Sequence, residues 1–167
     1  MTNEVNIFYL STDPYTAAEY HCDKHCVKMI VESAQLLSTA HRLLDNDKIA
    51  DDKNLYKSFS PNHPCAIWTR ENHRHYMWLF WLMNGLCIEY ALRYDKVHKV
   101  SETGLRDQLR EPPDNIIMDA FSPPPQCMPD KYKTQNTVQA YRNYYLGEKA
   151  TFAQWRLNKP KWWKGEN

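Results

Sequence analysis

One stretch, from His21 to Arg42, most constrains what this chain can fold into. Its sequence, HCDKHCVKMIVESAQLLSTAHR, has the spacing of a long amphipathic helix. At about 100° per residue, one side gathers apolar and small residues: Cys22, Cys26, Met29, Ile30, Ser33, Leu36, Leu37, Ala40 and Leu44. The opposite side forms a polar stripe: His21, Lys24, His25, Lys28, Glu32, Gln35, Thr39 and Arg42.

Two residues of this helix break the division between its faces. Asp23 and His41 point into the apolar sector, together with Val27, Ala34 and Leu37. Burying a carboxylate there is costly unless it is paired or has a chemical task. Asp23 therefore has either a structural bond or a catalytic role, and both readings stay open at this point.

The composition is that of one ordinary globular domain. A chain of 167 residues is long enough for a substantial core, and 43% hydrophobic residues argue against disorder. The net charge is only +1, so binding to nucleic acid would require clustering of the Lys and Arg residues. With 4 Gly and no GxGxxG or P-loop pattern, a glycine-rich phosphate loop is excluded.

The cysteines and the apolar segments bear on location. Five Cys are an odd number, and the opening MTNEVNIF is mixed polar, unlike a signal peptide. We expect reduced thiols in an intracellular, cytoplasmic protein, a phage-infected bacterial cell being one such setting. The most apolar segment, Tyr76 to Met83, is too short to span a bilayer, so no membrane partner is expected. The sequence carries no signal for an oligomeric state.

Two core helices are predicted, over residues 14–44 and 64–94. The apolar run from Val5 to Leu10, a strand-like segment or a buried extended arm, precedes the first, which Asp13 and Pro14 begin. The second follows a Ser60–Pro64 turn, is interrupted near residues 69–71, and should turn certain polar residues outward: Asn72, His75 and Arg93.

The other segments have simpler patterns. We expect an acidic surface loop over 45–53, a short helix over 102–109 and an irregular Pro-rich crossing loop over 112–129. A helix over 137–146 should end at Gly147 as its C-cap, followed by a helical turn over 152–157 and a basic–aromatic tail over 155–167. The sequence thus predicts a single all-α domain over residues 1–167, with long irregular loops.

Histidines in the central helix raise the possibility of a metal site. His21 and His25 are spaced i, i+4, which suits two ligands on one helical face. Cys22 and Cys26 point elsewhere, so His63 with Cys65, or His73 with His75, would have to complete the site from afar. A metal held by His21, His25 and His63 is the weaker alternative; the leading expectation is no metal and no cofactor.

Three further groups have both a chemical and a structural interpretation. Lys24, Lys28 and Glu32 form an acid–amine set or solvated ion pairs on one helix. Asn62, His63 and Pro64 form an anion site at a helix start or an ordinary turn. The aromatic and basic residues of the last third either stack on bases and contact phosphates or fill the core: Tyr132, Tyr141, Arg142, Tyr144, Tyr145, Trp155, Arg156, Trp162 and Trp163.

The combination of motifs resembles a known enzyme superfamily. The series Asp23-Lys24-x3-Lys28-x3-Glu32-x2-Gln35-Leu36-Leu37, followed by Asn62-His63-Pro64 and Trp68, resembles the pyrimidine dimer DNA glycosylase (endonuclease V-like) superfamily, nearest its small phage and bacterial branch. The resemblance runs from about Asn6 to Tyr94 and includes Ala18-Glu19-Tyr20, which resembles the segment before the family's catalytic glutamate.

The resemblance implies a helical, cofactor-free DNA glycosylase and abasic-site lyase that binds double-stranded DNA and flips a damaged or modified pyrimidine. In that family the α-amino group of a Thr after the initiator Met attacks the sugar as a Schiff-base nucleophile, and a helix carboxylate assists. Here Thr2 would carry the amine and Asp23 would be the carboxylate, one step beyond the family's position. Lys24 or Lys28 are the alternative amines.

The candidate site residues divide into two groups. The catalytic candidates are Asp23, Thr2, Lys24, Lys28, Glu32, His21 and His25. The DNA-binding candidates are Arg42, Asn62, His63, Arg70, Arg74, Arg142 and Trp162. Two other functions stay open: a metal-dependent hydrolase or nucleotide-modifying enzyme using His21, Asp23 and His25, and a non-catalytic DNA-binding or partner-binding module.

Overall fold

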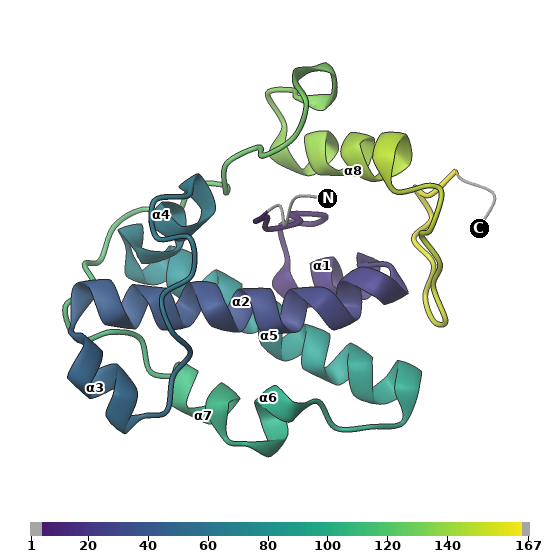
Figure 1. The fold of residues 1–167 in the computed structure, drawn as a ribbon. Coiled ribbons are helices and arrows are strands. Elements are labelled where there is room, and N and C mark those ends of the chain that lie inside the picture. Colours follow the sequence, from purple (N-terminus) through teal and green to yellow (C-terminus); the bar gives the residue numbers. More distant parts are fainter. Residues whose placement is uncertain (1–4, 165–167) are drawn as a thin grey trace.

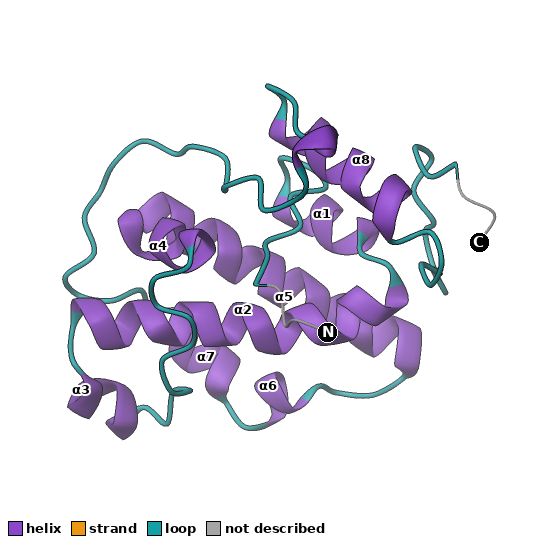
Figure 2. Cartoon of the chain, turned by 45° about the horizontal axis from the view of Figure 1, so that its top comes forward, coloured by secondary structure: helices purple, strands orange, loops and turns teal. Residues whose placement is uncertain are grey.

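The chain folds as a helical domain, as its sequence predicts. The computed structural model describes residues 5–164, and within that range there are helices but no strands (Figure 1, Figure 2). The elements are, in order, α1 (Pro14–Tyr20), α2 (Asp23–Leu44), α3 (Asp47–Asp52), α4 (Pro64–Glu71), α5 (His73–Tyr94), α6 (Lys99–Glu102), α7 (Leu105–Leu109), a 3-10 turn η1 (Asp130–Tyr132) and α8 (Thr137–Glu148).

Two helices of 22 residues each, α2 and α5, form the centre of the fold and pack against one another. Helix α1 packs on α5, where Gly85 lets the two backbones approach. A Cβ built at Gly85 would lie 2.9 Å from the Ala18 Cβ and 3.0 Å from the Tyr15 ring. The absence of a side chain at Gly85 therefore sets how closely α1 can dock.

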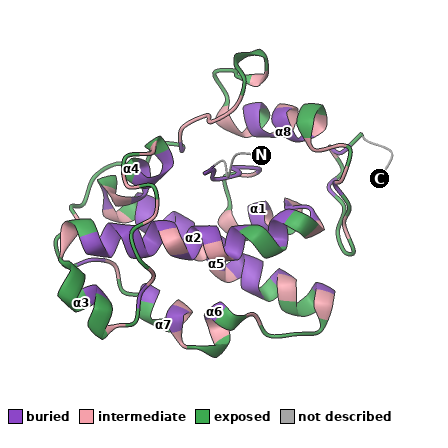
Figure 3. Cartoon of the chain, viewed as in Figure 1, coloured by how far each residue is buried: buried purple, intermediate pink, exposed green. Residues whose placement is uncertain are grey.

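Helix α2 is covered on both of its faces, which the sequence alone did not indicate. The residues Val5 to Leu10 form a buried extended arm between α2 and α8 (Figure 1). Buried residues consequently run along most of α2 (Figure 3). Much of the expected polar stripe is inside the protein: His21, His25, Glu32, Thr39 and Arg42.

The predicted helix starts are confirmed where a cap and a proline coincide. Asp13 accepts the Thr16 N–H at 2.8 Å to cap α1, and His63 caps α4 ahead of Pro64. Asn72 separates α4 from α5, close to the predicted interruption, and caps α5 by accepting the His75 N–H at 3.0 Å. The two predicted core helices are therefore each divided by a short break.

Several local predictions were wrong. The acidic segment after α2 contains helix α3, and residues 152–157 form no helix. Gly147 lies inside α8, whose C-cap is Lys149, and a side chain at position 147 would overlap the Tyr132 ring. The residues expected to face outward are buried: Asn72 at the start of α5, and His75 and Arg93 within it.

The Pro-rich segment is an irregular crossing loop, as predicted, and it is fastened at the α4–α5 junction. Trp68 donates its indole N–H to the Ser122 carbonyl at 3.0 Å. Asn72 donates to the Ala120 carbonyl at 3.2 Å, and Ser122 donates its backbone N–H to the His75 ring at 3.0 Å. Side chains of the two helices therefore bind backbone atoms of the loop.

The C-terminal segment folds back onto the helices instead of extending into solvent. Trp155 donates its indole N–H to the Tyr20 carbonyl at 3.0 Å, and Trp163 is buried. Asp23 donates its backbone N–H to the Gln154 carbonyl at 2.7 Å. Rings of this segment take part in packing, which agrees with the structural one of the two interpretations left open for the basic–aromatic tail.

Within residues 5–164, none of the helices combines the length and the apolar character needed to cross a membrane.

The close approach at Gly85 makes a stability prediction. Gly85→Ala should lower the free energy of unfolding by about 1–3 kcal/mol, because the added methyl group overpacks against Ala18 and Tyr15. In an exposed helical position the same change would stabilise by up to about 1 kcal/mol. Urea denaturation followed by circular dichroism measures the difference, with Leu92→Ala on the exposed side of α5 as the control. A stabilised Gly85→Ala variant would contradict the packing argument.

Candidate functional site

A buried carboxylate, Glu32, lies on the side of α2 that the N-terminal arm covers. The residue is buried, with a relative exposure of 6%. The Asn6 backbone N–H donates to Glu32 Oε1 at 2.8 Å. Burial raises the pKa of Glu32, while the Asn6 hydrogen bond and Lys28 oppose that rise. None of the ion pairs formed within residues 5–164 includes Glu32.

Asn6 connects this carboxylate to the last helix. Its side-chain oxygen accepts the Tyr141 hydroxyl at 2.8 Å, and its side-chain amide donates to the Cys127 carbonyl at 2.9 Å. Tyr141 also accepts the Cys127 backbone N–H at 3.3 Å. Asn6, Tyr141 and Cys127 therefore form a buried hydrogen-bonded network that fixes the arm against α2, α8 and the crossing loop.

The beginning of α4 adds a histidine and a thiol to the same region. The Cys65 backbone N–H donates to His63 Nδ1 at 3.0 Å, which orients the imidazole. Cys65 Sγ lies 3.6 Å from Cys127 Sγ. The hydrogen bond to Cys127 and burial raise the pKa of the Cys65 thiol, and the charge of Glu32 raises it further. We call the group of Asn6, Glu32, His63, Cys65, Cys127 and Tyr141 the Glu32 site.

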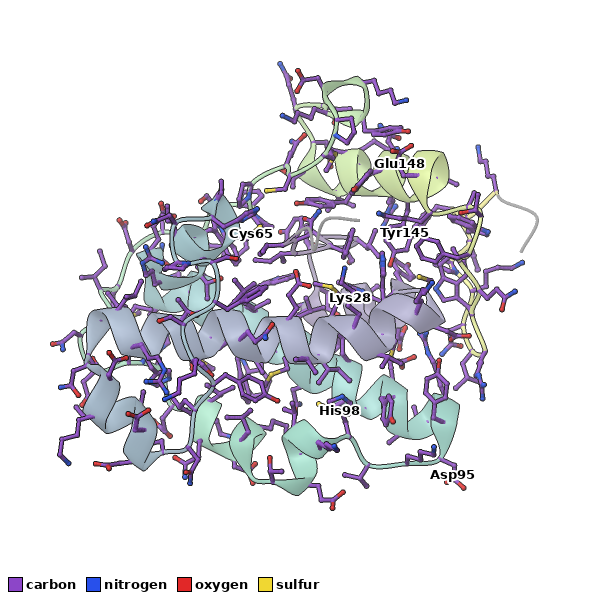
Figure 4. All side chains as sticks on the ribbon, in the orientation of Figure 1. Lys28, Cys65, Asp95, His98, Tyr145 and Glu148 are labelled. Atoms are coloured by element: carbon purple, nitrogen blue, oxygen red, sulfur yellow. The ribbon has the colours of Figure 1, made fainter. Side chains whose placement is uncertain are left out.

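Lysines lie beside the Glu32 site on the side of α2 that faces α8. Lys28 is exposed, one helical turn before Glu32, and Figure 4 places it between the labelled Cys65 and Tyr145. Burial lowers the pKa of His25 well below its ordinary value, and the charges of Lys149, Lys28 and Lys24 contribute. All three ammonium groups therefore lie near one buried imidazole.

Asp23 has a structural partner. Its Oδ1 accepts from Arg93 Nη1 at 3.1 Å and from the Arg156 backbone N–H at 3.1 Å. Arg93 also pairs with Glu89 at 3.0 Å. Its guanidinium donates to the Glu19 and His21 carbonyls as well, at 3.0 and 2.8 Å. Asp23 thus belongs to an ion-pair network that ties four segments together, which gives this carboxylate the structural bond that was one of its two expected roles.

The two helix histidines are also structural. His21 Nδ1 bonds to the Ala17 carbonyl at 2.7 Å, and burial lowers the pKa of His21 to about 4. His25 stacks on Phe8 with ring centroids 4.3 Å apart and bonds to the Tyr145 hydroxyl at 2.7 Å. His63 is not grouped with them. In the described part of the chain, the one set of three groups able to hold a metal is His63, Cys65 and Cys127.

Arg42 is occupied inside the fold. Its side chain is buried, pairs with Asp47 at 3.0 Å and Asp51 at 2.8 Å, and donates to the Tyr56 carbonyl at 2.7 Å. These bonds hold α3 and the following loop against the end of α2. In this placement the guanidinium of Arg42 is used by bonds inside the fold.

The other DNA-binding candidates do not share one surface. Arg70 donates to the Pro61 carbonyl at 2.7 Å, and Asn62 is exposed in the same turn. Arg142 donates to the Leu10 carbonyl at 3.1 Å and stacks on Trp162, so both are used in packing. Arg74 borders an apolar groove, with Met77, Trp81 and Met118, that no member of the Glu32 site lines.

Of the predicted residues, the structure brings together Lys28, Glu32 and His63, and it adds four that were not site candidates. Cys65 was named only as a possible ligand beside His63, Tyr141 only among the aromatic residues, Asn6 only as the start of the resemblance, and Cys127 not at all. Asn6, Cys65, Cys127 and Tyr141 come from the arm, α4, the crossing loop and α8. Two weak signals existed: Asn6 is the polar residue within the apolar VNIFYL run, and Cys65 follows two residues after His63. Cys127 and Tyr141 are too distant in sequence for any spacing to reveal them.

Comparison with known family models, curated proteins and solved structures found no match to this chain.

The Arg93 network makes a stability prediction. Arg93→Met should lower the free energy of unfolding by about 3–5 kcal/mol, because it leaves the buried Glu89 carboxylate without its cation. Equilibrium urea unfolding provides the measurement, with Arg74→Met, at an exposed position of α5, as the matched control. A loss of less than about 1 kcal/mol would show that the network contributes little net stability.

The burial of Glu32 makes a prediction about pH. Because its pKa is raised in the folded state, the folded chain binds this proton more tightly than the unfolded chain does. The contribution of Glu32 to stability is therefore fully present below its ordinary pKa of 4.5 and is lost as the pH rises through the raised value. Between those two pKa values, the free energy of unfolding of Glu32→Gln should rise relative to that of the wild type as the pH increases. Urea titrations at a series of pH values test this, and a pH-independent difference would contradict it.

Proposed function

We propose that the chain is a DNA glycosylase and abasic-site lyase of the endonuclease V-like kind, acting on a damaged or modified pyrimidine in double-stranded DNA. Glu32 is its catalytic carboxylate and Lys28 its imine-forming amine. The observation that carries the proposal is the position of Glu32: a buried carboxylate outside the ion pairs of residues 5–164, one helical turn from an exposed lysine.

Glu32 suits the chemistry better than Asp23 does. Asp23 is bound by the Arg93 guanidinium, whereas Glu32 receives a single backbone N–H from Asn6 among the described residues. Since burial raises the pKa of Glu32, its carboxylate is a stronger base than a solvated one. A carboxylate in a poorly solvated place also stabilises positive charge that develops on a sugar more strongly than it would in water.

Lys28 is the amine best placed relative to Glu32. The two side chains are spaced i, i+4 and therefore lie on the same face of α2. The charge of Lys28 acts on the Glu32 carboxylate. Lys24 lies a further turn away, with its ammonium 4.9 Å from the centre of the Phe152 ring. Lys24 and Lys149 are therefore assigned to phosphate contacts rather than to imine formation.

The reaction balances without a cofactor. The neutral amine forms a bond to C1′ as the bond from C1′ to the base breaks, and the base departs with the electron pair and takes up a proton. The C1′–O4′ bond then breaks, O4′ takes up the proton lost from nitrogen, and the opened sugar is left as the Schiff base. Glu32 then accepts the C2′ proton, and the 3′ phosphate leaves by β-elimination.

The N-terminal amine is the alternative nucleophile. Thr2 lies outside the described residues, but four peptide units separate it from Asn6, and an extended chain spans at most about 3.6 Å per residue. An amine at Thr2 could therefore reach no farther than about 14 Å from the backbone nitrogen that binds Glu32. The adduct must be mapped to decide between the two amines.

Borohydride trapping tests the proposal. Duplex DNA carrying a cyclobutane dimer, a modified pyrimidine or an abasic site is incubated with the protein and sodium borohydride, and the adduct is mapped by peptide mass spectrometry. We expect a covalent adduct on the peptide that carries Lys28. Lys28→Arg keeps the charge but cannot form an imine, so it should abolish the adduct and still bind DNA. Glu32→Gln should lower the single-turnover rate by about 10²-fold or more.

Two exposed positions serve as controls. Lys48→Ala on α3 and Glu102→Gln on α6 remove the same kinds of side chain away from the Glu32 site and should leave trapping unchanged. An adduct on the peptide that carries Thr2 would contradict the role of Lys28 and retain that of Glu32. Tight DNA binding without an adduct on any substrate would contradict the enzyme and favour a non-catalytic DNA-binding module.

A further inference from the structure

Three side chains from two distant segments converge at the start of α4. His63 is the N-cap of α4, Cys65 lies in its first turn, and Cys127 comes from the crossing loop. One ligand atom from each lies within 4.8 Å of the ligand atoms of the other two. Imidazole nitrogen and two thiolate sulfurs are a donor set typical of zinc.

The separation of the two sulfurs agrees with shared coordination. Two Zn–S bonds of about 2.3 Å at a tetrahedral angle place the sulfur atoms about 3.8 Å apart. Cys65 Sγ and Cys127 Sγ lie 3.6 Å apart, and the five cysteines form no disulfide. A disulfide would require about 2.0 Å, so the two segments would have to move closer together to form one.

The surroundings hold the three ligands in place. The Asn6 amide donates to the Cys127 carbonyl at 2.9 Å, and the Tyr141 hydroxyl accepts the Cys127 backbone N–H at 3.3 Å. Cys65 is fully buried within α4, and Pro64 fixes the backbone between His63 and Cys65. The Glu32 carboxylate acts electrostatically on Cys65, so negative charge lies close to where a dication would bind. Ligands fixed in this way have little ordering entropy to lose when a metal binds.

We propose that His63, Cys65 and Cys127, three members of the Glu32 site, bind a zinc ion, which fastens the crossing loop to the start of α4. Binding displaces the protons of the two thiols, so that Zn²⁺ and two neutral Cys side chains give a bis-thiolate complex and two protons released to solvent. The three protein ligands leave one tetrahedral position for water or a carboxylate oxygen. This site is distinct from the His21, Asp23 and His25 set, and it does not depend on the proposed reaction with DNA.

The experiment measures metal directly in the full-length protein. The chain is purified under reducing, chelator-free conditions and anaerobically, and zinc is quantified by plasma mass spectrometry. We expect about one zinc ion per chain. Cobalt(II) exchanged into the same protein should give the intense thiolate-to-metal charge-transfer absorption of a cysteine-ligated site.

Matched variants locate the site. Cys65→Ser and Cys127→Ser should each reduce bound zinc at least about tenfold and remove the charge-transfer band. Cys87→Ser alters another buried cysteine, on α5, and should retain both signals. Circular dichroism confirms that each variant is folded. His63→Gln adds a variant that leaves both thiols intact.

Three results would overturn the proposal. The wild type could be folded, reduced and metal-free even after incubation with zinc. A Cys65–Cys127 disulfide could be present in the anaerobically purified protein. Zinc content could also be unchanged in the folded Cys65→Ser and Cys127→Ser variants, which would place the metal elsewhere.

Discussion

The fold depends on covering both faces of α2. A helix with one apolar and one polar face can sit on a protein surface, but here much of the polar face is also enclosed, by the N-terminal arm and the last third of the chain, while Lys24 and Lys28 stay exposed. Each polar group so enclosed needs a partner, because an unsatisfied buried group costs on the order of 1–3 kcal/mol. His25 finds Tyr145, Glu32 finds the Asn6 N–H, and Arg42 finds two aspartates.

Because the second face of α2 is largely covered as well, the helices could be predicted from the sequence, but the burial of their side chains could not. Helix α2 follows from local spacing, and the starts of α1 and α4 follow from Asp13-Pro14 and His63-Pro64, which act within a few residues. Whether Arg93 faces solvent is decided by Glu19, His21 and Asp23, which are some 70 residues away in sequence. The hydrophobic periodicity of a helix indicates which face packs on the core. It cannot indicate that a second layer of the protein covers the opposite face.

The same limit applies to the candidate site: its local motifs could be predicted from the sequence, and its long-range contacts could not. Lys28, Glu32 and His63 belong to local motifs that resemble one enzyme superfamily, and they were named from the sequence. The sequence could not show which carboxylate, Asp23 or Glu32, is the better catalytic candidate, because both lie on the same predicted helix. What separates them is a guanidinium from α5 at Asp23 and an N–H from the arm at Glu32. Such long-range contacts are fixed by the packing of whole elements, and single-residue patterns carry no record of them.

The contacts of the arm have a consequence for how the molecule assembles. The first residues that the structure describes are held by residues much farther along the chain: Asn6 bonds to Cys127 and Tyr141, and Leu10 bonds to Arg142. Contacts of such high sequence separation form late, because a long loop must close before they contribute. A nascent chain on the ribosome can build α1, α2 and α5 and place Asn6 against Glu32, yet its arm lacks the contacts with Tyr141 and Arg142 until α8 emerges. The protein therefore completes the surroundings of Glu32 only after α8 has been synthesised.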